Sequence, residues 1–218
     1  MADFVLEPRF ALTDIAKAGR YGAQSDAPVG LTIQEQRGVR ILHVSARSGH
    51  GEAVCERLSN IVGQRVSDGP KATQAPPTPQ ALDSQNNFGQ IIIGVGRGQW
   101  LCLTPGTDVP SATESNVDIG ELATLTDHTS AKVILSLHGP HVRDALAKGC
   151  QLDLHPSIFG PGMAATTQID QIVCQLWRLD DSDTFQVMMA RSFSLSFWSW
   201  LTHASAEFGY QVLAPRVT

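Results

Sequence analysis

The spacing of apolar residues along the chain predicts strands alternating with short helices. The β-branched run over residues 39–46 predicts a strand, and the one-sided apolar pattern of residues 51–62 predicts a helix. Residues 91–95 and 100–103 predict two strands joined by a tight glycine-rich turn. The looser periodicity of residues 9–21 predicts a short helix.

The second part of the chain continues this order. Residues 132–137 predict a strand, followed by a short helix with Pro140 at its first position and Gly149 as a left-handed C-terminal cap. After a turn at residues 160–162, further strands are expected over residues 164–169, 172–179 and 185–189.

A final helix is predicted over residues 193–208. Five apolar residues at helical spacing are expected to face the core: Phe193, Phe197, Leu201, Ala204 and Phe208. The opposite side is rich in serine, with Glu207 as its one formal charge, which favours a face covered by a partner. Trp198 and Trp200 are therefore predicted partner contacts, together with Arg178 and Arg191 at the ends of strands.

The order of elements predicts an α+β fold made of two ferredoxin-like halves. We expect an N-terminal extension over residues 1–28 and one domain over residues 29–214, with halves of about 29–125 and 126–214. Residues 67–89 are dense in Pro, Gln, Ser and Asn, and they predict a mobile connection.

The composition and charge of the chain argue against some classes of function. The 218-residue chain has a net charge of −5 and scattered basic residues, which argues against nucleic-acid binding. Its charged share of 17% is below the roughly 25% typical of soluble domains, which favours coverage by partners. It has no apolar run of the roughly 20 residues that span a membrane, and its first residues do not resemble an export signal. We expect a cytoplasmic protein.

Several clusters of polar residues could carry chemistry, but their spacing favours structural roles. The loop at residues 94–99 lacks the third glycine of a dinucleotide motif and is interpreted as a hairpin turn. The acidic run at residues 180–183 is interpreted as an exposed turn rather than a calcium loop. Five candidate metal ligands lack the spacing of a metal site, so no metal site is predicted at His138, His141, Cys150, Asp153 and His155. The four dispersed cysteines are expected to be reduced and mostly buried.

A set of short motifs resembles the gamma subunit family of heterotetrameric sarcosine oxidase. The similarity is strong over about the last 90 residues and weaker over residues 39–103. It is carried by residues 139–140, 143–150, 152–156, 159–162, 176–181, 191–193, 198, 200–201 and 206–208.

This resemblance implies the fold of folate-binding aminomethyltransferases such as the glycine-cleavage T-protein. It also implies a non-catalytic structural subunit, partnered by alpha, beta and delta subunits, in an oxidoreductase of sarcosine catabolism. That complex demethylates sarcosine to glycine, forms hydrogen peroxide and passes a one-carbon unit to tetrahydrofolate. FAD, FMN, NAD, zinc and tetrahydrofolate are implied to bind to the other subunits.

The departures from the aminomethyltransferase pattern favour the non-catalytic role. Ile172 and Val173 stand where the acidic pair of these enzymes would fall, and apolar side chains cannot take a proton. His138 replaces the usual serine before Gly-Pro, and Gln99 replaces an acidic residue before Trp100. The alternatives are a stand-alone folate-binding or methyl-transferring protein and a homo-oligomeric scaffold.

Overall fold

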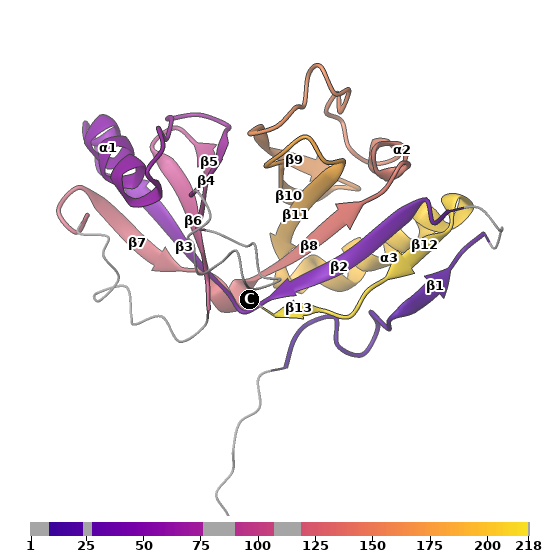
Figure 1. The fold of residues 1–218 in the computed structure, drawn as a ribbon. Coiled ribbons are helices and arrows are strands. Elements are labelled where there is room, and N and C mark those ends of the chain that lie inside the picture. Colours follow the sequence, from indigo (N-terminus) through magenta and orange to yellow (C-terminus); the bar gives the residue numbers. More distant parts are fainter. Residues whose placement is uncertain (1–8, 24–27, 76–89, 107–118, 218) are drawn as a thin grey trace, which may run out of the picture.

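The computed structural model describes residues 9–23, 28–75, 90–106 and 119–217, and these residues form two β-sheets (Figure 1). The larger sheet has the strand order β1–β12–β2–β8–β11–β10–β9, and β13 also pairs with β2. Its strands are β1 (Gly19–Tyr21), β2 (Leu31–Arg37), β8 (Lys132–His138), β9 (Ala164–Ile169), β10 (Ile172–Trp177), β11 (Thr184–Ala190), β12 (Tyr210–Val212) and β13 (Arg216–Val217). Strands from both predicted halves of the chain therefore share this sheet.

The smaller sheet is antiparallel, with the strand order β4–β5–β6–β3–β7. Its strands are β3 (Val39–Ala46), β4 (Ala72–Gln74), β5 (Ile91–Gly96), β6 (Gln99–Pro105) and β7 (Ala123–Asp127). The helices are α1 (Gly51–Val62), α2 (Val142–Ala147) and α3 (Ser194–Ser205), with short 3-10 turns at Thr129–Ala131, Arg191–Phe193 and Ala206–Phe208.

The elements stack in four layers, with helices on the two outer sides and the sheets between them (Figure 1). Helix α1 buries Val54 and Leu58 against one face of the smaller sheet. The other face of that sheet packs on the larger sheet through a core that includes Ile93, Leu101 and Trp177. Helices α2 and α3 cover the far face of the larger sheet. The smaller sheet is thus covered on both faces, which explains why β5 is apolar without alternation.

Most predicted elements are confirmed, including β3, α1 and β9 with their predicted bounds. The helix predicted over residues 9–21 is wrong, because residues 11–15 form turns and residues 19–21 form β1. Strand β1 pairs with β12, and Tyr21 stacks on Tyr210 with 5.4 Å between ring centroids. This long-range pairing outweighs the weak local helical pattern. Of the predicted connection at 67–89, residues 72–74 form β4, and residues 76–89 lie outside the described part.

The final helix is confirmed, but two positions on its faces differ from the prediction. Phe197, Leu201 and Ala204 are buried as expected. Phe193 is 53% exposed because it precedes α3 in a 3-10 turn, where the helical spacing does not apply. Ser194, on the serine-rich side that is predicted to face a partner, is buried within this chain and donates a hydrogen bond to the carbonyl of Arg191 at 2.7 Å.

The predicted caps of α2 are wrong. The helix begins at Val142, two residues after Pro140, and its C-terminal cap is Lys148 in a right-handed conformation. Gly149 has a different reason to be glycine. A Cβ at this position would lie 2.6 Å from Cζ2 of Trp200 and 3.1 Å from the backbone nitrogen of Asp170. Gly149 therefore allows the Trp200 ring to pack directly on the end of α2.

We expect Gly149→Ala to lower the free energy of unfolding by about 2 kcal/mol, because the added methyl group overpacks this contact. Urea unfolding followed by tryptophan fluorescence measures the change. Gly120→Ala is the control, since a Cβ there meets nothing within 4 Å and should change stability by less than about 0.5 kcal/mol. Equal stability of the two variants would contradict the packing role of Gly149.

Candidate functional site: an arginine network and a polar cleft

No metal site is predicted at the three histidines of this region, and in the structure each has a hydrogen-bond partner within the chain. His138 Nδ1 lies 3.1 Å from Thr184 Oγ1, and His155 Nδ1 lies 2.7 Å from Ser157 Oγ. His141 stacks on Phe208, and its Nδ1 lies 2.8 Å from an Asp144 carboxylate oxygen. Among the residues that the structure describes, no group of three His, Cys, Asp or Glu side chains is arranged to hold a metal ion.

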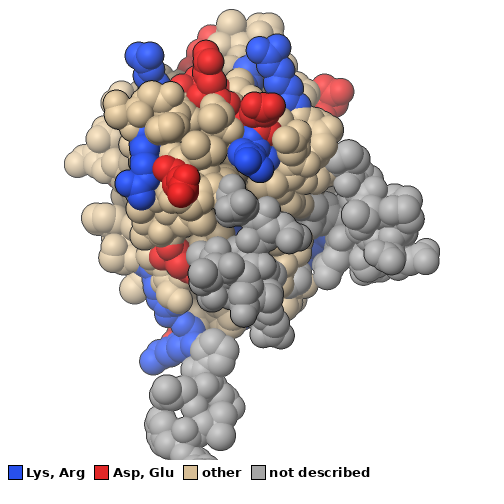
Figure 2. Space-filling model, turned by 90° about the vertical axis from the view of Figure 1, so that its left-hand side faces the viewer, with Lys and Arg blue, Asp and Glu red and all other residues tan. Residues whose placement is uncertain are grey.

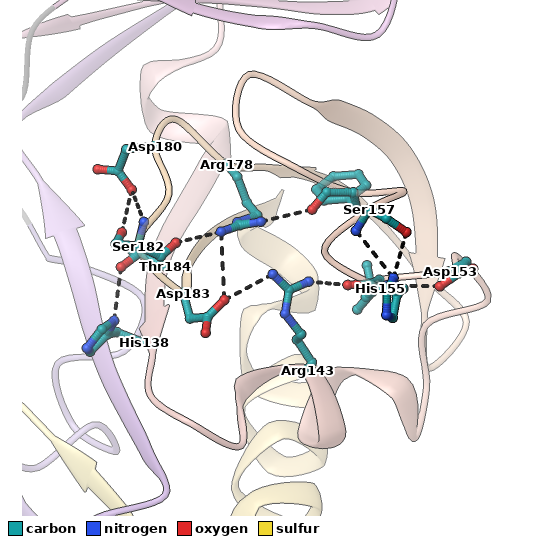
Figure 3. Close-up of polar contacts among 12 residues, drawn as sticks. His138, Arg143, Asp153, His155, Ser157, Arg178, Asp180, Ser182, Asp183 and Thr184 are labelled. Carbon is teal, nitrogen blue, oxygen red and sulfur yellow. Dashed lines mark hydrogen bonds and ion pairs between the residues drawn. The ribbon is translucent and has the colours of Figure 1, made fainter.

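Two arginines converge on the carboxylate of Asp183 (Figure 3). Arg143 Nη2 from α2 lies 3.0 Å from Asp183 Oδ1, and Arg178 Nη2 at the end of β10 lies 3.7 Å from the same atom. Both guanidinium groups also lie over the ring of Phe185, with 4.9 Å and 5.3 Å to its centroid. This arginine network has two cations, so Asp183 is held by charge from two sides.

Backbone carbonyls complete the arginine network. Arg178 donates to the carbonyls of Phe159 at 3.0 Å and Ser182 at 2.8 Å, and Arg143 donates to the carbonyl of Leu154. These bonds join α2, the loop after it and the turn between β10 and β11 (Figure 3). The network is a structural clamp, because its donors are directed at the chain itself. The acidic run at 180–183 forms the predicted exposed turn.

A polar cleft of about 390 Å³ opens beside the clamp, on the face of the larger sheet that is turned toward the smaller sheet. Its floor comes from β2, β8 and β11. The lining residues are Thr32, Gln34, Gln36, Gln74, Ser136, His138, Leu179, Asp180, Ser182, Thr184, Gln186, Leu213 and Arg216. The volume is that of a small binding site, and amides and hydroxyls dominate its lining.

Side-chain amides set the hydrogen-bonding character of this cleft. Gln186 Nε2 donates to Ser136 Oγ at 3.0 Å, and Gln34 Nε2 donates to the carbonyl of Ala214 at 3.0 Å. The Oε1 atoms of Gln36 and Gln186 are buried and have no hydrogen-bond partner in the described part of the chain. Because both oxygens are buried, the surface of the cleft does not present them as acceptors. Sequence reasoning missed the cleft, although the alternation of Thr32, Gln34 and Gln36 in one strand is a signal for a polar sheet face.

The four residues predicted to contact a partner lie in different environments. Arg178 is 3% exposed, and Trp198 is 9% exposed within the core under α3, so both offer little surface. Arg178 is buried by the contacts of the clamp, and Trp198 is buried by the packing of α3 on the larger sheet. Trp200 is half-buried against Phe197 and Gly149. Arg191 is exposed and donates to the carbonyl of Arg9. Contact of Trp200 or Arg191 with a partner stays a prediction.

The cysteines are free, and three of them are buried: Cys102, Cys150 and Cys174. Burial raises the pKa of Cys102 to about 12, and burial is also the main cause that raises the pKa of Cys174 to about 12. Both therefore remain protonated at neutral pH and are poor nucleophiles. Their chemistry fits packing rather than catalysis.

A pair of stacked histidines lies at the smaller sheet, with 5.4 Å between the rings of His43 and His128. Burial, and then the neighbouring His128, lower the pKa of His43. The unfolded state therefore binds a proton at this site more readily than the folded state does. The stability that His43 contributes is present above its ordinary pKa of about 6.5 and is lost as pH falls through the folded value.

We expect the wild-type chain to lose more stability than His43→Phe between pH 7.5 and pH 5.5, because phenylalanine keeps the ring stack and cannot be protonated. Urea midpoints at the two pH values measure the difference. His155→Gln, at an exposed loop position, is the control and should follow the wild type. Identical pH dependence in all three proteins would contradict the role of His43.

Surface charge shows no patch of one sign on the face drawn in Figure 2. Lys and Arg side chains alternate there with Asp and Glu side chains, and large areas carry neither. None of the helices described is long and apolar enough to cross a membrane. This face therefore lacks the continuous basic surface of a nucleic-acid-binding protein.

Comparison with protein families finds a match over residues 91–207 to the sarcosine oxidase gamma subunit family. The sarcosine oxidase subunit gamma of Corynebacterium sp. strain P-1 is 30% identical over 128 residues, which cover 58% of this chain and 62% of that relative. This match therefore spans less than two thirds of that relative's length. The subunit gamma of an Arthrobacter species is 25% identical over 201 residues, covering 92% of this chain and 91% of that protein.

Solved structures support the same fold. A chain of the heterotetrameric sarcosine oxidase from Corynebacterium sp. U-96 superposes with a TM-score of 0.70 at 22% identity, covering 92% of this chain and 96% of that one. The glycine cleavage system aminomethyltransferase T of Bartonella henselae superposes with a TM-score of 0.50 at 12% identity, covering 86% of this chain and 48% of that one. The predicted α+β fold of the T-protein type is thus confirmed.

Proposed function

Because the chain belongs to the sarcosine oxidase gamma subunit family, which it matches over residues 91–207, we propose that it is a structural subunit of a heterotetrameric sarcosine oxidase. The complex would contain alpha, beta and delta subunits and would oxidatively demethylate sarcosine to glycine. Hydrogen peroxide would be its second product, and the one-carbon unit would pass to tetrahydrofolate. The family match is the observation that carries this proposal.

A non-catalytic role is supported by the way the polar side chains of this chain are used. Arg143, Arg178 and Asp183 hold segments of the chain together, and His141 and His155 bond to residues two or three positions away. The thiols of Cys102 and Cys174 stay protonated. These groups have structural partners where a catalytic site would need them directed at a substrate.

The cofactors of the complex would then lie on the other subunits. FAD, FMN, NAD, zinc and tetrahydrofolate are the groups implied by the family, and we assign none of them to this chain. The apolar residues Ile172 and Val173, at the positions where aminomethyltransferases carry an acidic pair, support this assignment for folate. Neither side chain can bind the amine of a pterin or accept its proton.

Co-expression tests the proposal. The tagged chain is produced alone and together with alpha, beta and delta subunits from the same organism, and the products are compared by native mass spectrometry. We expect one copy of each subunit in the purified complex, with peroxide formation from sarcosine. The isolated chain should form no peroxide and carry no flavin.

Two variants test the non-catalytic role inside the complex. His141→Ala and His155→Ala should leave kcat within about twofold, because neither side chain would touch substrate. A chain that never co-purifies with the large subunits would overturn the structural role. A flavin or tetrahydrofolate bound by the isolated chain at micromolar concentration would overturn the assignment of cofactors to the other subunits.

A further inference from the structure

The outermost strand of the smaller sheet, β7, pairs on one side only. It is the last strand in the order of its sheet, and β3 is its neighbour (Figure 1). Just before β7, the carbonyl of Leu122 accepts a hydrogen bond from the N–H of Arg47 at 2.8 Å. Just after it, the N–H of His128 donates to the carbonyl of Ile41 at 2.8 Å. Because bonded residues alternate along an antiparallel pair, the even-numbered residues of β7 direct their backbone groups at β3.

The odd-numbered residues of β7 direct their backbone groups away from β3. The N–H and C=O groups of Leu125 and Asp127 have no backbone partner in the described part of the chain. The neighbouring side chains of Thr124 and Thr126 are exposed, and Leu125 is half-buried. Two donors and two acceptors therefore line an unpaired edge of the sheet.

The other edge strands are shorter or are closed by the chain itself. At one end of β9, the N–H of Ala164 donates to the carbonyl of Pro70 at 3.1 Å. At the other end, the N–H of Asp170 donates to the carbonyl of Gly149 at 3.1 Å. Strands β1 and β4 have three residues each. Among the strands that the structure describes, β7 is thus the longest edge without such contacts at its ends.

Strand β7 also lacks the features by which proteins protect an open edge, such as lysine, proline or a bulge. It pairs with β3 in unbroken register over five residues, and it contains neither lysine nor proline. Its one charge is Asp127, at the last position. Thr124 and Thr126 are β-branched and favour cross-strand pairing. The composition of β7 therefore favours the addition of a further strand.

Open space continues past the end of β7. A hollow of about 520 Å³ lies beside Asp127 and is lined by Arg40, Asp127, Thr129, Ser130 and Ala131. Arg40 is 7% exposed, and its Nε lies 3.7 Å from a carboxylate oxygen of Asp127. This lining is polar, so the hollow suits a polar side chain at the end of an added strand.

We propose that an extended segment of a partner subunit joins the five-stranded sheet as a sixth strand beside β7, bonding to the backbone of Leu125 and Asp127. This inference rests on the proposed function, because that function supplies the partner. Alternating N–H and C=O groups along one edge are complementary to an extended polypeptide rather than to a small molecule. Two copies of this chain joined through β7 alone would bury one pair of five-residue strands, far less than the roughly 1,600 Å² of a standard interface.

Hydrogen exchange of individual amides tests the proposal. In the isolated chain, the amides of Leu125 and Asp127 should exchange faster than those of Thr124 and Thr126, which bond to β3. In the complex with alpha, beta and delta subunits, exchange at Leu125 and Asp127 should slow at least tenfold, and the alternation should disappear. A complex in which these two amides exchange as fast as in the isolated chain overturns the proposal and leaves the proposed function standing.

Leu125→Pro removes the outward donor, and Leu125→Ala is its matched control. Both variants shorten the side chain, but alanine keeps the N–H, and proline is tolerated on an edge strand where this group points outward. The dissociation constant for the partner subunits, measured by biolayer interferometry, should be about tenfold higher for the proline variant than for the alanine variant. Equal dissociation constants would contradict the backbone pairing.

Thr126→Lys tests the same edge without changing the backbone. A lysine on an edge strand opposes pairing, so assembly should weaken at least fivefold while the urea midpoint of the isolated chain stays the same. Gln168→Lys is the control, because Gln168 is an exposed residue of β9. It should leave affinity unchanged. An equal loss of affinity in both lysine variants would reflect charge alone and would contradict the proposal.

A photo-crosslinking amino acid placed at Thr126 identifies the occupant of the edge. Crosslinks to one contiguous peptide of a partner subunit support the proposal. Crosslinks to a second copy of this chain overturn it. Failure of the wild-type chain to assemble would instead refute the proposed function.

Discussion

Trp177→Ala is expected to lower the free energy of unfolding by about 4 kcal/mol, the largest single effect we predict. Trp177 is fully buried at the end of β10 and belongs to the core between the two sheets. Its removal leaves a cavity that two rigid sheets cannot close. Urea unfolding followed by circular dichroism measures the loss.

Trp177→Phe separates packing from hydrogen bonding. The indole nitrogen of Trp177 has no hydrogen-bond partner among the described residues, so phenylalanine loses volume but no bond. It should cost less than half as much as alanine. Val173→Ala, at a 54% exposed position of the same strand, should cost less than about 0.5 kcal/mol. A loss below about 1 kcal/mol for Trp177→Ala would show that this layer does not hold the sheets together.

Arg178→Ala is expected to lower the free energy of unfolding by about 3 kcal/mol. The buried guanidinium donates to two backbone carbonyls and balances the charge of Asp183, and hydrogen bonds from charged groups are worth about 1.5–3 kcal/mol each. The exposure of Asp183 reduces the ion-pair part of this figure, because water can solvate the carboxylate left behind. Thermal and urea unfolding measure the change.

Two further substitutions define what Arg178 contributes. Arg178→Lys keeps the charge but cannot reach both carbonyls with a planar fork, so it should recover less than half of the loss. Asp181→Ala is the control. Asp181 is exposed in the turn between β10 and β11, and its replacement should leave the free energy of unfolding nearly unchanged. If Arg178→Ala is as stable as Asp181→Ala, then other contacts hold the loop after α2.

The sequence predicts those parts of the fold whose local pattern agrees with their burial. Helix α1 and strand β3 are confirmed with their bounds, because their apolar spacing matches the core that covers them. Strand β2 was not predicted, since its polar residues Thr32, Gln34 and Gln36 dilute its apolar signal. Its neighbours in the sheet come from residues about a hundred or more positions away, which local spacing cannot indicate.

The surroundings of individual residues are harder to read from the sequence than the family is. The motifs around α2 indicate the family correctly, yet Gly149 was interpreted as a cap because its partner, Trp200, lies far along the chain. Arg178 and Trp198 are buried by contacts that only the folded arrangement creates. The polar cleft is missed for the same reason, as its floor exists only once β2, β8 and β11 are aligned.

Strand β2 lies between β8 on one side and β12 and β13 on the other, so an early segment is completed by the last ones. During translation, β2 has no neighbour until residues 132–138 leave the ribosome, and one edge stays open until residues 210–217 follow. The nascent chain is therefore vulnerable to aggregation throughout synthesis, and chaperone protection of β2 should matter more than the modest size of the protein suggests.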